Sequence, residues 1–126
     1  MVVRRVSMSD NEKINYIEFP SRNLSVTKEF FSKAFGWSFI DFGSDYVAIE
    51  NAGINGGFYH SDLCVSTENG SPLVVLYSSD LEQSMINIEN AGGEIIKPIF
   101  AFPGGRRFHF EDPNRNEYAV WSDKDI

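Results

Sequence analysis

The sequence predicts an α+β domain built from two βαβββ units, because strand-like and helix-like patterns follow one another in the same order twice. Residues 14–20 alternate apolar and polar side chains as a strand does, and residues 24–35 then carry the apolar stripe of a helix. A strand, a helix and three strands recur between residues 72 and 122. We therefore expect mixed sheets that form a cup, with the helices on the outside.

The first unit is predicted to span residues 14–59. Asn23 suits the N-cap of the helix at 24–35, and Gly36 ends that helix, since glycine readily adopts the left-handed conformation at a helix C-terminus. Strands at 37–42 and 45–50 are expected to form a hairpin across Gly43 and Ser44. The sequence GGFY at 56–59 completes the unit as its last short strand.

The second unit is predicted to span residues 72–122, after a polar, turn-rich linker at 60–71. Asp80 is the expected N-cap of a helix at 81–91, which follows a strand at 72–78 and precedes strands near 94–100, 106–111 and 117–122. A shift of 57 residues places Asn23 on Asp80 and Gly36 on Gly93. These matches at cap and stop positions indicate an internal duplication.

Length and composition favour a single domain at 14–126, preceded by a flexible tail at 1–13. The net charge of −7 argues against nucleic acid or an anionic membrane as a partner. The first thirteen residues lack the apolar run of a signal peptide. Cys64 is the only cysteine, so no internal disulfide can form, and we expect a cytoplasmic protein.

Three stretches resemble one known family: IEFPSRNLSVTKEFFSKAFGW, LYSSDLEQSMINIENAGGEI and FPGGRRFHFEDPNRNEYAVW. They are similar to the vicinal oxygen chelate superfamily, which includes glyoxalase I, bleomycin resistance proteins and extradiol dioxygenases. The resemblance covers residues 14–122 and implies paired βαβββ units around a cup. It also implies a homodimer, because many relatives are dimers and some complete the cup between two chains. The superfamily hosts many reactions as well as binding proteins, so the fold does not fix the activity.

In the enzymes of this family the cup holds a divalent metal ion. Carried over residue by residue, three of the ligand positions fall on Tyr16, Leu73 and Ala119, and the fourth lies in or beside GGFY, which His60 follows. Leucine and alanine cannot bind a metal, and a neutral tyrosine is a poor ligand for the usual ions. The resemblance therefore implies a protein without the family's metal, and we expect no cofactor.

The turn DPNRN at 112–116 predicts the register of the last two strands, with Glu111 opposite Glu117, His109 opposite Ala119, and Arg107 opposite Trp121. Phenylalanine, tyrosine and valine occupy the other face, so these polar residues and Trp121 are expected to face the cup, as are Tyr16 and Glu18. The predicted ligand-binding residues are Tyr16, Glu18, Arg107, His109 and Trp121, and Glu18 and His109 are the catalytic candidates.

Two of these residues have competing interpretations. His109 is a structural residue paired with Glu111 or Glu18, a ligand contact or general base, or a metal ligand together with His60 and Glu18. Glu18 is one half of an ion pair with Arg107 or His109, or a catalytic base, because a carboxylate in a partly apolar cup needs a partner.

The favoured function is binding of a small molecule in an aromatic and polar cup without a metal. The alternative is an enzyme of the lyase, glyoxalase or dioxygenase kind that uses an unusual metal set or acid–base chemistry by Glu18 and His109. An accessory domain whose partner is another protein is a third hypothesis.

Overall fold

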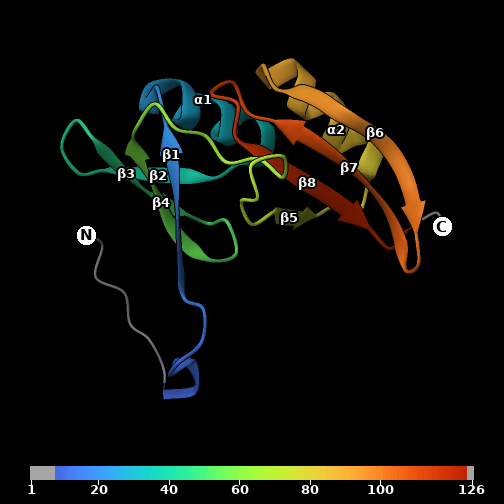
Figure 1. Ribbon diagram of the computed structural model, residues 1–126, viewed down its shortest axis with the longest axis horizontal. Helices are drawn as coiled ribbons and strands as arrows, with labels where there is room; N and C mark the ends of the chain where they lie inside the picture. Colours follow the sequence, from blue (N-terminus) through green and yellow to red (C-terminus); the bar gives the residue numbers. More distant parts are fainter. Residues whose placement is uncertain (1–7, 125–126) are drawn as a thin grey trace.

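The computed structural model of the protein describes residues 8–124 (Figure 1). Of the predicted flexible tail at 1–13, residues 1–7 lie outside this range, and Met8–Asp10 forms the short 3-10 helix η1. The remaining elements follow as two successive βαβββ units, which confirms the predicted α+β architecture.

The first unit contains one helix and a four-stranded mixed sheet, called here the first sheet. Helix α1 (Leu24–Phe35) begins where predicted, with the side chain of Asn23 accepting a hydrogen bond from the N–H of Val26, and ends at Gly36 with φ of 75°. The sheet has the strand order β1 (Tyr16–Ser21), β4 (Asn55–His60), β3 (Tyr46–Glu50) and β2 (Ser38–Asp41). β1 pairs with β4 in parallel, and the other neighbours are antiparallel.

The second unit repeats this plan. Helix α2 (Leu81–Ala91) is capped by Asp80, which accepts a hydrogen bond from the N–H of Gln83, and it is ended by Gly92. The second sheet has the order β5 (Val74–Tyr77), β8 (Glu117–Ser122), β7 (Gly105–Glu111) and β6 (Glu94–Phe102). β5 pairs with β8 in parallel. The predicted pairing of the last two strands is confirmed residue for residue.

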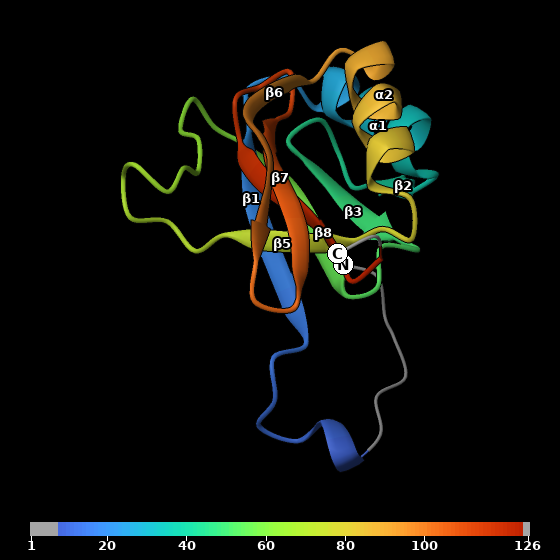
Figure 2. The same ribbon diagram turned by 90° about the vertical axis from the view of Figure 1, so that its right-hand side faces the viewer.

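A single aromatic core joins the two units. Helices α1 and α2 lie side by side, and the linker between the units lies on the side away from them (Figure 2). Phe31 of α1 packs on Phe58 of the first sheet and on Tyr118 of the second, with ring centroids 5.5 and 5.4 Å apart. Phe19 of β1 also contacts Tyr118. Burying each such ring contributes roughly 1.5–3 kcal/mol, so α1 stabilises both sheets.

Hydrogen bonds from the turn between β7 and β8 also hold the units together. The side-chain amide of Asn114 donates to Thr27 Oγ1 of α1 at 2.7 Å, and that of Asn116 donates to the Pro20 carbonyl of β1 at 2.7 Å. The Asn116 side chain accepts the N–H of Val65 in the linker. Within residues 8–124 no helix is long and apolar enough to cross a membrane.

Candidate functional site

Each sheet has one face on the aromatic core and one face turned away from it, called here its open face. Ile17 and Phe19 of β1 pack in the core, so Tyr16 and Glu18 lie on the open face of the first sheet, as alternation predicts. Phe108 and Phe110 of β7 are buried in the core. Arg107 and His109 therefore lie on the open face of the second sheet, with Trp121 opposite Arg107.

A hydrogen-bonded cluster occupies the open face of the first sheet. The hydroxyl of Tyr46, from β3, lies 2.5 Å from that of Tyr16 and donates to Glu18 Oε2 at 2.8 Å. Burial raises the pKa of Tyr46 well above its usual range, and the hydrogen bonds with Tyr16 and Glu18 raise it further. Tyr46 is therefore a neutral donor to the Glu18 carboxylate, which corrects the expectation that Arg107 or His109 would be the partner of Glu18.

The side chain of Tyr46 reaches this position because a glycine stands on β4 two residues from Tyr59, the register partner of Tyr46. A Cβ at Gly57 would overlap the hydroxyl and ring carbons of Tyr46. Gly57 belongs to GGFY, the stretch to which the resemblance assigned the fourth metal ligand. The phenol of Tyr46 thus lies over the position of the fourth metal ligand. It contacts Tyr16, which stands at the ligand position of the first strand.

The residues at the ligand positions do not fit a divalent metal. Ala119 is fully buried and carries no donor, and Leu73 has none either. His60 is exposed at the end of β4, and His109 is bound to a residue of its own sheet, so His60, Glu18 and His109 do not form the alternative set. Across residues 8–124 no three histidine, cysteine or acidic side chains are grouped to hold a metal.

His109 forms a buried pair with Glu117 on the open face of the second sheet. Its Nδ1 lies 2.8 Å from Glu117 Oε2, and the Glu117 carboxylate also accepts hydrogen bonds from the N–H and hydroxyl of Thr67 in the linker. Burial acts to raise the pKa of Glu117, but the hydrogen bonds from His109 and Thr67 outweigh it and hold that pKa below its usual range. Glu117, and neither Glu111 nor Glu18, is therefore the partner of His109.

Aromatic rings surround Arg107 on the same open face. Its guanidinium carbon lies 5.2 Å from the ring centroid of Phe100 and 5.7 Å from that of Phe102. Trp121 contacts Phe102 and also Tyr77, which is half exposed. The face thus combines a cation with apolar surface that is open to a ligand.

The predicted site residues form two groups in one chain. Tyr16 and Glu18 share one cluster, and Arg107, His109 and Trp121 share the other open face. Among the described residues no hydrogen bond, ion pair or ring contact joins one group to the other. The sequence did not identify Tyr46, Phe100 and Glu117 as members of these groups. The predicted pairing of Glu117 with Glu111 did place Glu117 on the correct face of the sheet.

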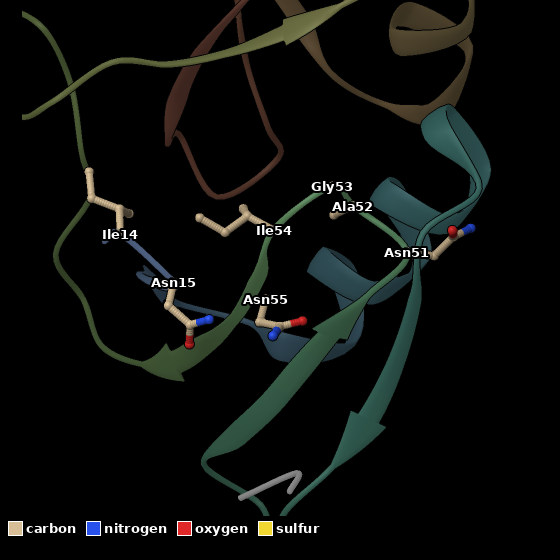
Figure 3. A pocket seen from close by; sticks show the side chains of 7 residues that line it. All are labelled: Ile14, Asn15, Asn51, Ala52, Gly53, Ile54 and Asn55. Carbon is tan, nitrogen blue, oxygen red and sulfur yellow. The ribbon is translucent and has the colours of Figure 1, made fainter. Parts of the chain in front are cut away.

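Two pockets flank the turn between β3 and β4. One, of about 340 Å³, lies between the residues before β1 and this turn, with Ile14 and Asn15 on one side and Asn51 on the other (Figure 3). The second, of about 370 Å³, is apolar and lies between the first unit and β5, where Trp37 and Leu76 are among its lining residues. Neither contains any of the five predicted site residues.

Comparison with solved structures places this architecture among known proteins. A glyoxalase-related enzyme from Fulvimarina pelagi has 17% identity and a TM-score of 0.73, with 88% of each chain covered. The fosfomycin resistance protein FosX from Listeria monocytogenes, as a mutant complexed with Mn(II) and a dihydroxypropylphosphonic acid, has 18% identity and a TM-score of 0.72 over 87% of this chain and 89% of that one. A glyoxalase I mutant from Zea mays has 18% identity and a TM-score of 0.72, and the match spans 91% of this chain but 47% of the maize chain.

These identities support the fold alone, and no protein of curated function matches significantly. The model of one family matches residues 13–120, which is most of the chain. The protein therefore belongs to the glyoxalase/bleomycin resistance protein/dioxygenase superfamily.

Proposed function

We propose that the protein binds a small organic molecule on the open faces of its sheets, without the divalent metal of the family's enzymes. The observation that carries this proposal is the position of Tyr46, whose hydroxyl lies over Gly57 and contacts Tyr16 and Glu18. With a hydrogen-bonded phenol over Gly57, the family's ligand positions do not supply a set of side chains that can bind a metal.

The open face of the second sheet supports binding of an organic ligand. Trp121, Tyr77 and Phe102 form adjoining ring contacts, and 51% of Tyr77 and 42% of Val75 is exposed. Apolar and aromatic surface with a few polar groups is typical of small-molecule sites. Because the two groups of site residues are not joined within one chain, we propose a homodimer that brings the open face of one copy to that of another.

A ligand screen by tryptophan fluorescence tests this proposal. The chain has two tryptophans, and Trp37 is stacked on Phe31 in the core with ring centroids 4.6 Å apart. Quenching by a ligand should be lost in Trp121→Phe and retained in Trp37→Phe. The opposite result would place the ligand in the apolar pocket beside Trp37 and would overturn the proposal.

We also propose a cytoplasmic location, which suits a chain with one cysteine.

A lyase or glyoxalase-type enzyme is the second candidate, and the His109–Glu117 pair favours it. A carboxylate that accepts the Nδ1 proton orients the imidazole and leaves Nε2 to exchange protons with a substrate. Glu18 lies on the other sheet, so His109 is the stronger candidate for the general base. His109→Gln should then abolish turnover of a substrate and leave its binding largely intact, whereas unchanged turnover would remove this candidate.

A further inference from the structure

We propose that Lys97, Arg107 and His109 form an anion subsite beside the ring of Phe100, and that this subsite holds a carboxylate or phosphate group of the ligand. This inference rests on the proposed binding function and specifies the chemical class of the ligand. The three cationic or protonatable side chains lie on adjoining positions of β6 and β7, where Lys97 is opposite His109 and Phe100 is opposite Arg107.

Neither Lys97 nor Arg107 forms an ion pair within residues 8–124, although the chain has 18 acidic and 11 basic residues. The Lys97 ammonium lies 4.7 Å from the centroid of Phe100, so both cations contact the same ring. The Arg107 Nε is buried without a hydrogen-bond partner in the described structure. A buried guanidinium N–H without an acceptor is costly, and a carboxylate or phosphate oxygen would satisfy it.

Three acidic side chains near this face have other partners. Glu117 accepts hydrogen bonds from His109 and Thr67, and Glu111 lies 3.9 Å from Arg115. Asp123 accepts a hydrogen bond from Tyr77. Glu68, Glu111 and Glu117 line a pocket together with Lys97, but within residues 8–124 none of them forms an ion pair with Lys97 or Arg107. The two cations beside Phe100 therefore keep their capacity to bind an anion.

His109 supplies the third group of the subsite. Only 5% of this residue is exposed, and its Nε2 is buried with no partner in the part of the chain that the structure describes. Because Glu117 fixes Nδ1, Nε2 lies on the far side of the ring from that carboxylate. An N–H at Nε2 would donate a hydrogen bond to the anion.

Phe100 contacts these groups from a strand that is irregular at this point. Its ring centroid lies 6.0 Å from that of His109, and the register of β6 against β7 shifts between Lys97 and Phe100. Pro98 adds no backbone donor to the ladder there. The subsite requires the ring of Phe100 to turn aside on this edge strand, so that the anion reaches the buried nitrogens. The rings of Trp121 and Phe102 would then contact an aromatic or planar body attached to the anion.

Calorimetric titration with four probes tests the subsite: benzoate, phenyl phosphate, inorganic phosphate, and benzyl alcohol as the neutral control. Benzoate or phenyl phosphate should bind more tightly than benzyl alcohol, and the better of the two identifies the preferred anionic group. Arg107→Gln should weaken anion binding about tenfold or more, with a smaller loss for Lys97→Gln. Lys33→Gln, which removes the same charge from α1, should change nothing. Phe100→Ala should strengthen binding of inorganic phosphate, because no ring has to move.

Arg107→Lys keeps the charge but loses the planar fork, so partial binding is expected even where Arg107→Gln folds poorly. Equal binding of benzoate and benzyl alcohol, or wild-type affinity in Arg107→Gln, would overturn the subsite. Neutral ligands that still quench Trp121 in that case would leave the broader binding proposal intact. A different outcome would overturn only the proposed function. In that outcome no ligand quenches Trp121, while inorganic phosphate still binds through Arg107.

Discussion

The hydroxyl of Tyr46 lies over the α-carbon of Gly57, within the space that any larger side chain would need. Tyr46 is paired with Tyr59, two residues beyond Gly57, so its side chain leans along the neighbouring strand. At that position it donates a hydrogen bond to Glu18 and contacts Tyr16. The position of the tyrosine therefore requires a glycine on β4. The two residues fill the place to which the resemblance assigns a metal ligand.

Gly57→Ala should therefore destabilise the protein. The added methyl group would collide with the Tyr46 hydroxyl and force the ring away, at a cost of about 1–3 kcal/mol in the free energy of unfolding. Urea denaturation of the wild type and the variant measures this cost. Tyr46→Ala removes the obstacle, so Gly57→Ala should cost much less in that background. Strictly additive effects of the two substitutions would show that this contact is not the reason for the glycine.

Stability should depend on the ionisation of Asp112, a buried carboxylate in the turn between β7 and β8. Burial raises its pKa from 3.8 to about 6, although hydrogen bonds from Tyr118, Asn116 and Asn114 oppose the rise. A raised pKa means that the folded state holds the proton more tightly than the unfolded state. The stabilising contribution is therefore present below pH 3.8 and is lost as the pH rises to about 6 and above, at about 3 kcal/mol in total.

Asp112→Asn provides the matched comparison, because asparagine has nearly the same shape and cannot ionise. The difference in unfolding free energy between wild type and variant should shift in favour of the variant between about pH 4 and pH 7. Denaturant titrations at several pH values in this range measure that difference. Parallel pH profiles of the two proteins would mean that Asp112 titrates in the folded state as it does in the unfolded chain.

Asn114 should be a major contributor to the contact between the units. Its side-chain amide donates to Thr27 Oγ1 and to the Asn23 carbonyl at the start of α1. Asn114→Ala removes these bonds from a buried position and should cost about 1–3 kcal/mol in the free energy of unfolding. Asn90→Ala, at an exposed position of α2, is the control and should stay within about 0.5 kcal/mol of wild type. Similar stabilities of the two variants would contradict a role of Asn114 in joining the units.

Both helices were predictable to the residue, because Asn23, Asp80 and the glycines that follow each helix mark their ends with local chemistry. The register of β7 and β8 was also predictable, since a short turn fixes which residues face each other. These features depend on neighbours in the sequence.

The partners of Glu18 and His109 were not predictable in the same way. Glu18 is bound by Tyr46, 28 residues away, which reaches it only because Gly57 leaves space between them. Glu117 was expected on the correct face, but its hydrogen bond to His109 depends on side-chain orientation across a strand pair. The sequence pattern predicts which face of a sheet each residue lies on. Which of these residues form hydrogen bonds with each other depends on distances across the sheet, which the pattern does not give.

Metal content tests the proposal that a tyrosine and glutamate cluster replaces the divalent-metal site of the family's enzymes. Protein purified without chelator should contain far less than one metal ion per chain by inductively coupled plasma mass spectrometry. Calorimetric titration of the same protein with Mn²⁺ should give no stoichiometric binding. One Mn²⁺ or Zn²⁺ per chain, lost in Glu18→Gln and removed by EDTA, would contradict the claim.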